Sequence, residues 1–261
     1  MNDREWNAIT RRGVQIVSSA REGAIPLLLT GSAAIDMRCP AGRSLVLRNQ
    51  AAPRDIDLVC LSKFRIKLSH FMALQQFRGA LDLYSHPYTS RDVFWGMCDS
   101  QLVRADVVYD YLSYVYVLDV RKDFDRDGAT ISLQNLLMSK LQIRELGLRD
   151  IVHICAVLLQ CSAEQRPLDS GYFEPMRLRT GMDYRCERDF ENSLMITSSA
   201  MESGDILLEA REREELRIAL LICLKSLAKT KHGAGWWIGR AKASMGINPP
   251  EPEEDEEHPV V

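Results

Sequence analysis

The stretch that decides the fold runs Leu27-Leu28-Leu29-Thr30-Gly31-Ser32 and resumes at Arg54-Asp55-Ile56-Asp57-Leu58-Val59-Cys60-Leu61. Each part holds an apolar run of strand length, which predicts a buried strand. A glycine-serine turn ends the first strand, and an Asp-x-Asp pair opens the second. Because side chains alternate along a strand, we expect Asp55 and Asp57 on the same face of the sheet.

A third carboxylate, Asp106, lies within Val103-Arg104-Ala105-Asp106-Val107-Val108-Tyr109. A charge in an apolar strand is costly unless it has a partner. Carboxylates that lie close together repel, and Mg²⁺ (or Mn²⁺) relieves this by binding their oxygens while keeping positions for water and phosphates. We therefore predict Asp55, Asp57 and Asp106 as metal ligands and catalytic residues. The alternatives are a solvated strand edge for the Asp-x-Asp pair and an ion pair with Arg104 for Asp106.

The glycine-serine turn is the predicted phosphate-binding element. Gly31 allows backbone conformations closed to other residues and close approach of a phosphate. Ser32 would begin a helix, whose free N–H groups attract anions. Gly31 and Ser32 are thus predicted to bind the nucleotide, although a Gly-Ser pair is also common in ordinary turns.

A lysine lies in the apolar stripe of a helix predicted over residues 132–146, with Ser132 as its N-cap. Lys140 would either reach the carboxylates and hold nucleotide phosphates or extend its tip to solvent. Arg144 lies near the same stripe and is a second candidate for the nucleotide. Asp150 would either cap the next helix, expected over residues 150–159, or orient Lys140 or Arg144 from behind. His153 is expected to be a hydrogen-bonded core residue.

Composition is that of an ordinary globular protein. The 261 residues are 46% hydrophobic and 26% charged, with a formal net charge of -3. An acidic run over residues 251–257 supplies much of the negative charge, so the body is slightly positive and a nucleic-acid partner is not excluded. Seven cysteines without a Cys-x-x-Cys spacing indicate a reducing cytoplasm rather than disulfides or zinc. No stretch is long and apolar enough for a membrane span.

The pattern predicts a mixed α/β domain with a central sheet over residues 1–128, a helical domain over 129–246 and a disordered acidic tail over 247–261. Helices are expected over residues 3–22, 32–38, 65–77 and 206–230, and strands over 24–30, 55–61, 81–84, 93–97, 101–109 and 114–120. Residues 41–53 are read as a loop or inserted hairpin, and residues 165–205 as short helices and loops.

Two further patterns have ordinary explanations. Asp123-Phe124-Asp125-Arg126-Asp127-Gly128 begins like a calcium loop, but Gln134 stands where the bidentate glutamate belongs. We read it as a charged turn. Trp236-Trp237 lies in a basic segment that would stack on bases or, as we prefer, anchor the C-terminal segment to the body.

Together these residues resemble the DNA polymerase β-like nucleotidyltransferase superfamily. Its pattern is a hydrophobic-Gly-Gly/Ser turn, an Asp-x-Asp/Glu strand and a lone carboxylate between hydrophobics, which here are Thr30-Gly31-Ser32, Asp55-Ile56-Asp57-Leu58 and Ala105-Asp106-Val107. The run over residues 136–143 and Leu148-Arg149-Asp150-Ile151 looks like the abortive-infection toxin branch. The resemblance covers residues 27–159.

The resemblance implies the activity and the partners. It implies a nucleotidyltransferase that moves a nucleoside monophosphate from an NTP, such as ATP, to an acceptor hydroxyl, with a tRNA end as acceptor in the toxin branch and an antitoxin as partner. In that branch a lysine and a following aspartate, here Lys140 and Asp150, belong to the active site. Residues 41–53 lengthen the usual spacing between the turn and the Asp-x-Asp pair, and His153 replaces a common acidic residue. The rival readings are a non-catalytic binding module on the same fold and an enzyme that modifies proteins.

Overall fold

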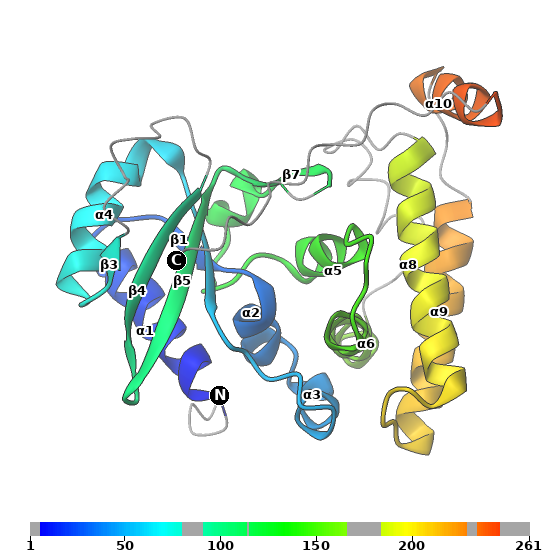
Figure 1. The fold of residues 1–261 in the computed structure, drawn as a ribbon, viewed down its shortest axis with the longest axis horizontal. Helices are drawn as coiled ribbons and strands as arrows, with labels where there is room; N and C mark the ends of the chain where they lie inside the picture. The colour runs from blue at the N-terminus through cyan, green and yellow to red at the C-terminus, as the bar shows by residue number, and fades with distance from the viewer. Residues whose placement is uncertain (1–5, 80–90, 114, 166–183, 229–233, 246–261) are drawn as a thin grey trace, which may run out of the picture.

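The computed structural model describes residues 6–79, 91–113, 115–165, 184–228 and 234–245. Its centre is a five-stranded sheet in the order β1-β2-β5-β4-β3 (Figure 1). The strands are β1 Leu27–Leu29, β2 Ile56–Cys60, β3 Arg78–Gly79, β4 Arg91–Cys98 and β5 Gln101–Tyr109. Only β2 and β5 run parallel; the other neighbouring pairs are antiparallel. The predicted mixed sheet is therefore confirmed.

Helices cover the sheet and continue beyond it. They are α1 Ala8–Glu22, α2 Gly31–Arg38, α3 Arg43–Arg48, α4 Arg65–Leu74, α5 Leu133–Leu141, α6 Leu148–Ala163, α8 Tyr184–Ser203, α9 Ala210–Ala228 and α10 Ala234–Ser244. Short 3-10 turns span Pro40–Gly42, Ser62–Phe64 and Arg121–Asp125, and β6 Tyr111–Ser113 pairs with β7 Val117–Asp119. Figure 1 shows α1 and α4 on one side of the sheet and α2, α5 and α6 on the side toward α8 and α9. The expected helical C-terminal part is confirmed.

Strand β4 shows why the sheet has two different faces. Its side chains alternate between buried (92, 94, 96 and 98) and more exposed positions (91, 93, 95 and 97). Gly96 lies on the buried face, where the Phe77 ring packs directly on its backbone. The residues of β5 that alternate in the same way, Val103, Ala105 and Val107, are also buried. One face of this hairpin is thus core, and the opposite face is open.

Residues 41–53 form a 3-10 turn and helix α3, so the expected loop or hairpin was wrong. The short apolar island fits a helix because Leu45 and Val46 are both buried. Helix α6 holds this segment from one side through residues at helical spacing. Arg149 donates to the Ala52 carbonyl (2.8 Å), His153 Nε2 contacts the Ala51 carbonyl (2.9 Å), and Gln160 Oε1 accepts from Ala41 N–H (3.1 Å).

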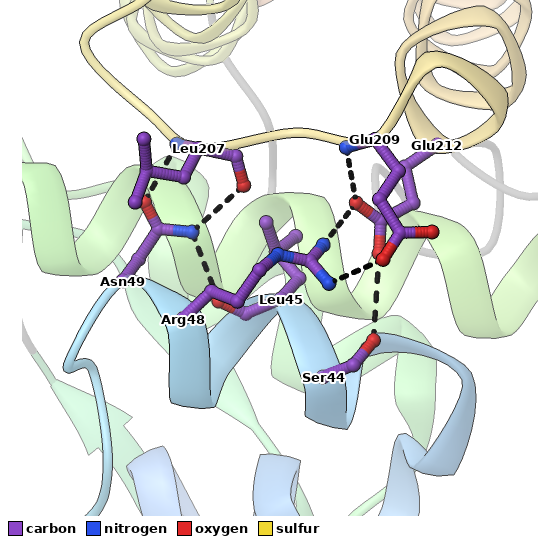
Figure 2. A network of polar contacts seen from close by, with 7 residues as sticks. All are labelled: Ser44, Leu45, Arg48, Asn49, Leu207, Glu209 and Glu212. Carbon is purple, nitrogen blue, oxygen red and sulfur yellow. Dashed lines mark hydrogen bonds and ion pairs between the residues drawn. The ribbon is translucent and has the colours of Figure 1, made fainter.

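On its other side α3 binds the segment that opens α9 (Figure 2). Arg48 forms ion pairs with Glu209 (2.7 Å) and Glu212, while Asn49 donates to the Leu207 carbonyl (3.1 Å) and accepts from its N–H (2.8 Å). Residues 41–53 therefore connect the sheet-bearing part of the chain to its C-terminal helices.

Several expected boundaries also need correction. Helix α1 begins at Ala8 rather than residue 3, because the Asn7 side chain caps it by accepting from Ile9 N–H. Helix α5 begins after the predicted N-cap Ser132 but ends at Leu141 rather than 146. Residues 184–203 form one long helix, α8, where short helices and loops were expected. The predicted strand 81–84 and the acidic tail lie outside the described residues.

Two sequence patterns have structural roles. Buried Asp123 accepts hydrogen bonds from Ser132 N–H (3.0 Å) and Asn135 Nδ2 (2.5 Å), and so supports the start of α5. Trp236 Nε1 donates to Glu187 (3.0 Å), and its ring meets Tyr184 edge-on. The second contact favours the anchoring interpretation of the tryptophan pair. Within the described ranges, no helix is both long and apolar enough to cross a membrane.

The tightest packing of the connecting segment supplies a stability prediction. A Cβ added at Gly42 would lie 2.5 Å from the Cα of Ala156, a backbone atom that cannot move aside. Gly42→Ala should lower the free energy of unfolding by about 1–3 kcal/mol, measured by urea denaturation. Gly23→Ala is the control, because its nearest neighbour would lie at 3.4 Å. Equal effects of the two substitutions would contradict this packing.

Candidate active site

The predicted carboxylates lie together, partly buried, on the face of the sheet opposite to the Phe94 core. Strands β2 and β5 pair in parallel with Asp57 opposite Asp106, so both side chains leave the same face of adjacent strands. Asp55 lies just before β2, two residues from Asp57. One oxygen of each of the three carboxylates falls within 4.8 Å of the others. Strand register thus brings together Asp57 and Asp106, which lie 49 positions apart in the sequence.

Asp106 has two arginine partners. Arg91 Nη2 lies 3.0 Å from one carboxylate oxygen of Asp106 and Arg104 Nε lies 3.0 Å from the other. The pair with Arg104 was the alternative that the sequence offered for Asp106. Arg91 was missed, because its contact depends on the β4–β5 pairing and no local pattern signals it. These guanidinium groups offset part of the negative charge of the cluster.

The electrostatics of the cluster centre on Asp57. Burial disfavours its charged form, and the negative charges of Asp55 and Asp106 raise its pKa further, to about 7; Lys140 and Arg91 act in the opposite direction. A carboxyl group so perturbed gains most from a nearby cation. Three carboxylate oxygens in mutual reach form a donor set that suits a hard divalent ion such as Mg²⁺. The residues present therefore fit the metal that the sequence predicts.

Gly31 packs against the carboxylate of Asp57. It has φ +60, in the left-handed region, and an added Cβ would lie 2.7 Å from Cγ of Asp57. Gly31 opens α2, and the preceding Thr30 N–H donates to the Asp57 carbonyl (2.9 Å). Buried Ser32 follows in the first turn of α2. The turn therefore places the N-terminus of a helix, with its free N–H groups, directly beside the carboxylates.

Lys140 is close enough to the cluster to lower the pKa of Asp57. Its ammonium group lies 2.9 Å from an oxygen of Asp150, and its side chain is 15% exposed, so it is not a solvent-extended lysine. Asp150 is not a helix cap, because α6 begins at Leu148 with Gly147 as its N-cap. It lies instead in the first turn of α6, in contact with Lys140. His153 is a buried core residue, with a pKa lowered to about 3 by burial and by Lys140.

Arg144 has a different set of partners. It ion-pairs with Asp189 of α8 at 3.5 Å and lines a pocket of about 440 Å³ together with Arg185 and Arg188. Asp189 also accepts a hydrogen bond from the Tyr116 hydroxyl (2.6 Å). A contribution of Arg144 to nucleotide binding stays a prediction. The roles of the carboxylates, Gly31, Ser32 and Lys140 likewise stay predictions, although their proximity favours them.

Comparison with known proteins gives the following. No protein-family model matches the chain, and no curated protein matches it. Among solved structures, the antibiotic-resistance factor ANT(2'')-Ia in solution is 17% identical over 65% of this chain and 89% of its own, with a TM-score of 0.38. In its crystal structure in complex with adenylyl-2''-tobramycin, the identity is 15% over 62% of this chain and 91% of the other, with a TM-score of 0.36. An antigenic nucleotidyltransferase-like protein from Paracoccidioides brasiliensis is 13% identical over 82% of this chain and 92% of its own, with a TM-score of 0.44. With TM-scores below 0.5, these similarities carry no conclusion about the activity of this chain.

The raised pKa of Asp57 predicts a linkage between pH and stability. A carboxyl group whose pKa is higher in the folded than in the unfolded state loses stabilising free energy as pH rises from about 4 to about 7. The melting temperature of Asp57→Asn relative to the wild type should therefore increase between pH 5 and pH 8. Mg²⁺ should raise the wild-type melting temperature more at pH 8 than at pH 5. An equal Mg²⁺-induced rise in melting temperature at pH 5 and pH 8 would contradict competition between protons and the cation.

The close approach of Gly31 to Asp57 gives a second prediction. Gly31→Ala should remove most of the Mg²⁺-induced rise in melting temperature, because the added Cβ displaces the Asp57 carboxylate and strains the backbone. Gly147→Ala is the matched control, since its Cβ would have a nearest neighbour at 3.8 Å. Differential scanning fluorimetry with and without Mg²⁺ makes the comparison. An unchanged metal response in Gly31→Ala would argue against a metal bound at Asp57.

Proposed function

We propose that this chain is a Mg²⁺-dependent nucleotidyltransferase that moves a nucleoside monophosphate from an NTP to an acceptor hydroxyl and releases pyrophosphate. The observation that carries the proposal is the set of three carboxylates whose oxygens lie within 4.8 Å of one another beside the turn at Gly31. A turn that leads into a helix N-terminus binds phosphates, and clustered carboxylates bind the divalent ions that accompany them. The combination suits phosphoryl transfer better than any other reaction class.

Each residue has a role that follows from its position. Asp55, Asp57 and Asp106 would hold Mg²⁺ or Mn²⁺, which when bound would neutralise charge on the triphosphate and activate the attacking hydroxyl. Asp106 would in addition accept the proton of the acceptor hydroxyl. The backbone N–H groups at Gly31 and Ser32 would bind phosphate oxygens. These contributions are positioning and electrostatic stabilisation, without a covalent intermediate on the protein.

Lys140 would balance the charge of the phosphates. It belongs to α5 and lies close enough to lower the pKa of Asp57, and Asp150 would fix its direction through the 2.9 Å contact. This contact restrains the Lys140 side chain, which would lower the entropy lost when a phosphate binds. Arg144, which follows the C-terminal end of α5, would contribute if an anion drew it from Asp189.

The resemblance to the toxin branch adds finer proposals. It suggests ATP or another NTP as donor, a tRNA end as acceptor, an antitoxin protein as partner and a cytoplasmic enzyme. A non-catalytic module on the same fold is disfavoured, because all three carboxylates are present and close together. A protein hydroxyl as acceptor would use the same site, and the experiment below separates it from RNA.

The test is a transfer assay with each of the four NTPs labelled at the α-phosphate, in Mg²⁺, with tRNA, aminoglycosides or a protein extract as acceptor. Label should appear on one acceptor class. Asp57→Asn should reduce transfer at least 100-fold, because loss of a ligand charge weakens metal binding. Asp127→Asn should leave transfer unchanged, because Asp127 is exposed and is not one of the three clustered carboxylates. Transfer by Asp57→Asn within tenfold of the wild type would contradict the assignment.

A further inference from the structure

The open face of the β4–β5 hairpin has exposed apolar side chains that the core does not use. Trp95 is 44% exposed and Met97 54% exposed on β4, and Leu102 is 66% exposed on β5. Trp95 and Met97 alternate along β4 with buried Phe94 and Gly96, so they lie on the opposite face of the sheet. Leu102 lies on that same face, because it pairs directly with Met97. Large apolar groups gathered on one open sheet face are uncommon without a binding function.

The strand register places this surface beside the carboxylates. Asp106 pairs with Val93 on one side and with Asp57 on the other. Trp95 is two residues after Val93 on the same face of β4, in the next row of cross-strand pairs, where it lies directly opposite Arg104 of β5. Two residues along a strand correspond to about 7 Å. The Trp95 side chain therefore emerges one row, about 7 Å, from the carboxylate that would accept the proton of the acceptor.

Arginines flank Trp95 on both sides. In the same cross-strand row, Arg78 of β3 pairs with Trp95, and Trp95 pairs with Arg104 of β5. Arg78 is exposed, and Arg104 is partly exposed and contacts Asp106. We call Arg78, Trp95 and Arg104 the platform row. An indole between two guanidinium groups attracts a ligand that is both planar and anionic.

We propose that the platform row binds the acceptor of the transfer reaction, that this acceptor is a single-stranded nucleic-acid end, and that one of its bases stacks on Trp95. Aromatic side chains on an open sheet face stack the bases of single-stranded RNA in other proteins. Arg78 and Arg104 would attract the adjoining phosphates. The inference rests on the proposed function, because it places the acceptor hydroxyl one row away, at Asp106.

The charge of the row argues against other acceptors. A polycationic acceptor such as an aminoglycoside would meet two guanidinium groups beside the indole. A peptide hydroxyl would gain apolar contact with Met97 and Leu102 but would bring no anion to exposed Arg78; Arg104 already contacts Asp106. A nucleic-acid end satisfies both, since its base has an apolar face and its backbone carries the charge.

The test is a binding titration that needs no NTP and no metal. The probes are fluorescein-labelled adenosine tetranucleotide RNA and an abasic tetranucleotide with the same number of phosphates, followed by fluorescence anisotropy. Trp95→Leu should weaken binding of the adenosine probe about 5- to 100-fold. It should change binding of the abasic probe less than twofold. Trp95→Phe, which keeps a ring, should retain most of the affinity.

The matched control is Trp237→Leu. Trp237 is also exposed, 54%, but belongs to α10, far from the sheet in Figure 1. Its substitution should leave both affinities unchanged. The proposal is overturned if the wild type does not bind the adenosine probe, or if Trp95→Leu binds it as the wild type does. It is also overturned if Trp95→Leu weakens the binding of the adenosine and abasic probes equally.

The acceptor proposal and the enzyme proposal fail separately. Asp57-dependent transfer onto an aminoglycoside or a protein, with a KM for that acceptor unaffected by Trp95→Leu, overturns the platform and keeps the enzyme. Stacking on Trp95 without transfer to any acceptor from any NTP overturns the enzyme and keeps a nucleic-acid-binding surface.

Discussion

Repulsion among three carboxylates is the constraint around which this molecule is organised. The parallel pairing of β2 with β5 holds Asp57 opposite Asp106, and Asp55 lies close by. At such separations the charges interact by several kcal/mol when partly removed from water. Burial and the charges of Asp55 and Asp106 outweigh the opposing effects of Lys140 and Arg91, so the pKa of Asp57 is raised to about 7. A divalent cation bound there, as proposed, would offset the remaining repulsion.

The surroundings of the cluster follow from this constraint. Gly31 leaves space for the Asp57 carboxylate and directs the N-terminus of α2 to it. From the other side, α5 supplies Lys140 and α6 supplies Asp150 to hold it. Residues 41–53 stabilise this arrangement, because α3 is bound by α6 on one side and by the start of α9 on the other (Figure 2). The segment that lengthens the chain between turn and carboxylates thus also connects the two parts of the molecule.

The sequence was sufficient for the features that depend on local pattern. Strand β5 matches its predicted span, since buried apolar residues alternate along it from Val103 to Tyr109, and Ser132 caps α5 because a hydroxyl satisfies a free N–H of its first turn. The common face of the three aspartates follows from strand periodicity and from one parallel pairing. Features decided by tertiary contacts were not predictable. The Arg91–Asp106 ion pair depends on the β4–β5 register. The Arg144–Asp189 ion pair depends on α8, in a region that was predicted as short helices and loops. Helix α3 has too short an apolar run to be recognised without its contacts with α6.

The most direct test of the account is to count the divalent ions that the carboxylates hold. Electron paramagnetic resonance of Mn²⁺, titrated against the protein with a non-hydrolysable ATP analogue, measures the number bound per chain. The account predicts tight binding of about two ions in the wild type and its loss in Asp57→Asn. Absence of tight Mn²⁺ binding, or equal binding by wild type and variant, would contradict it.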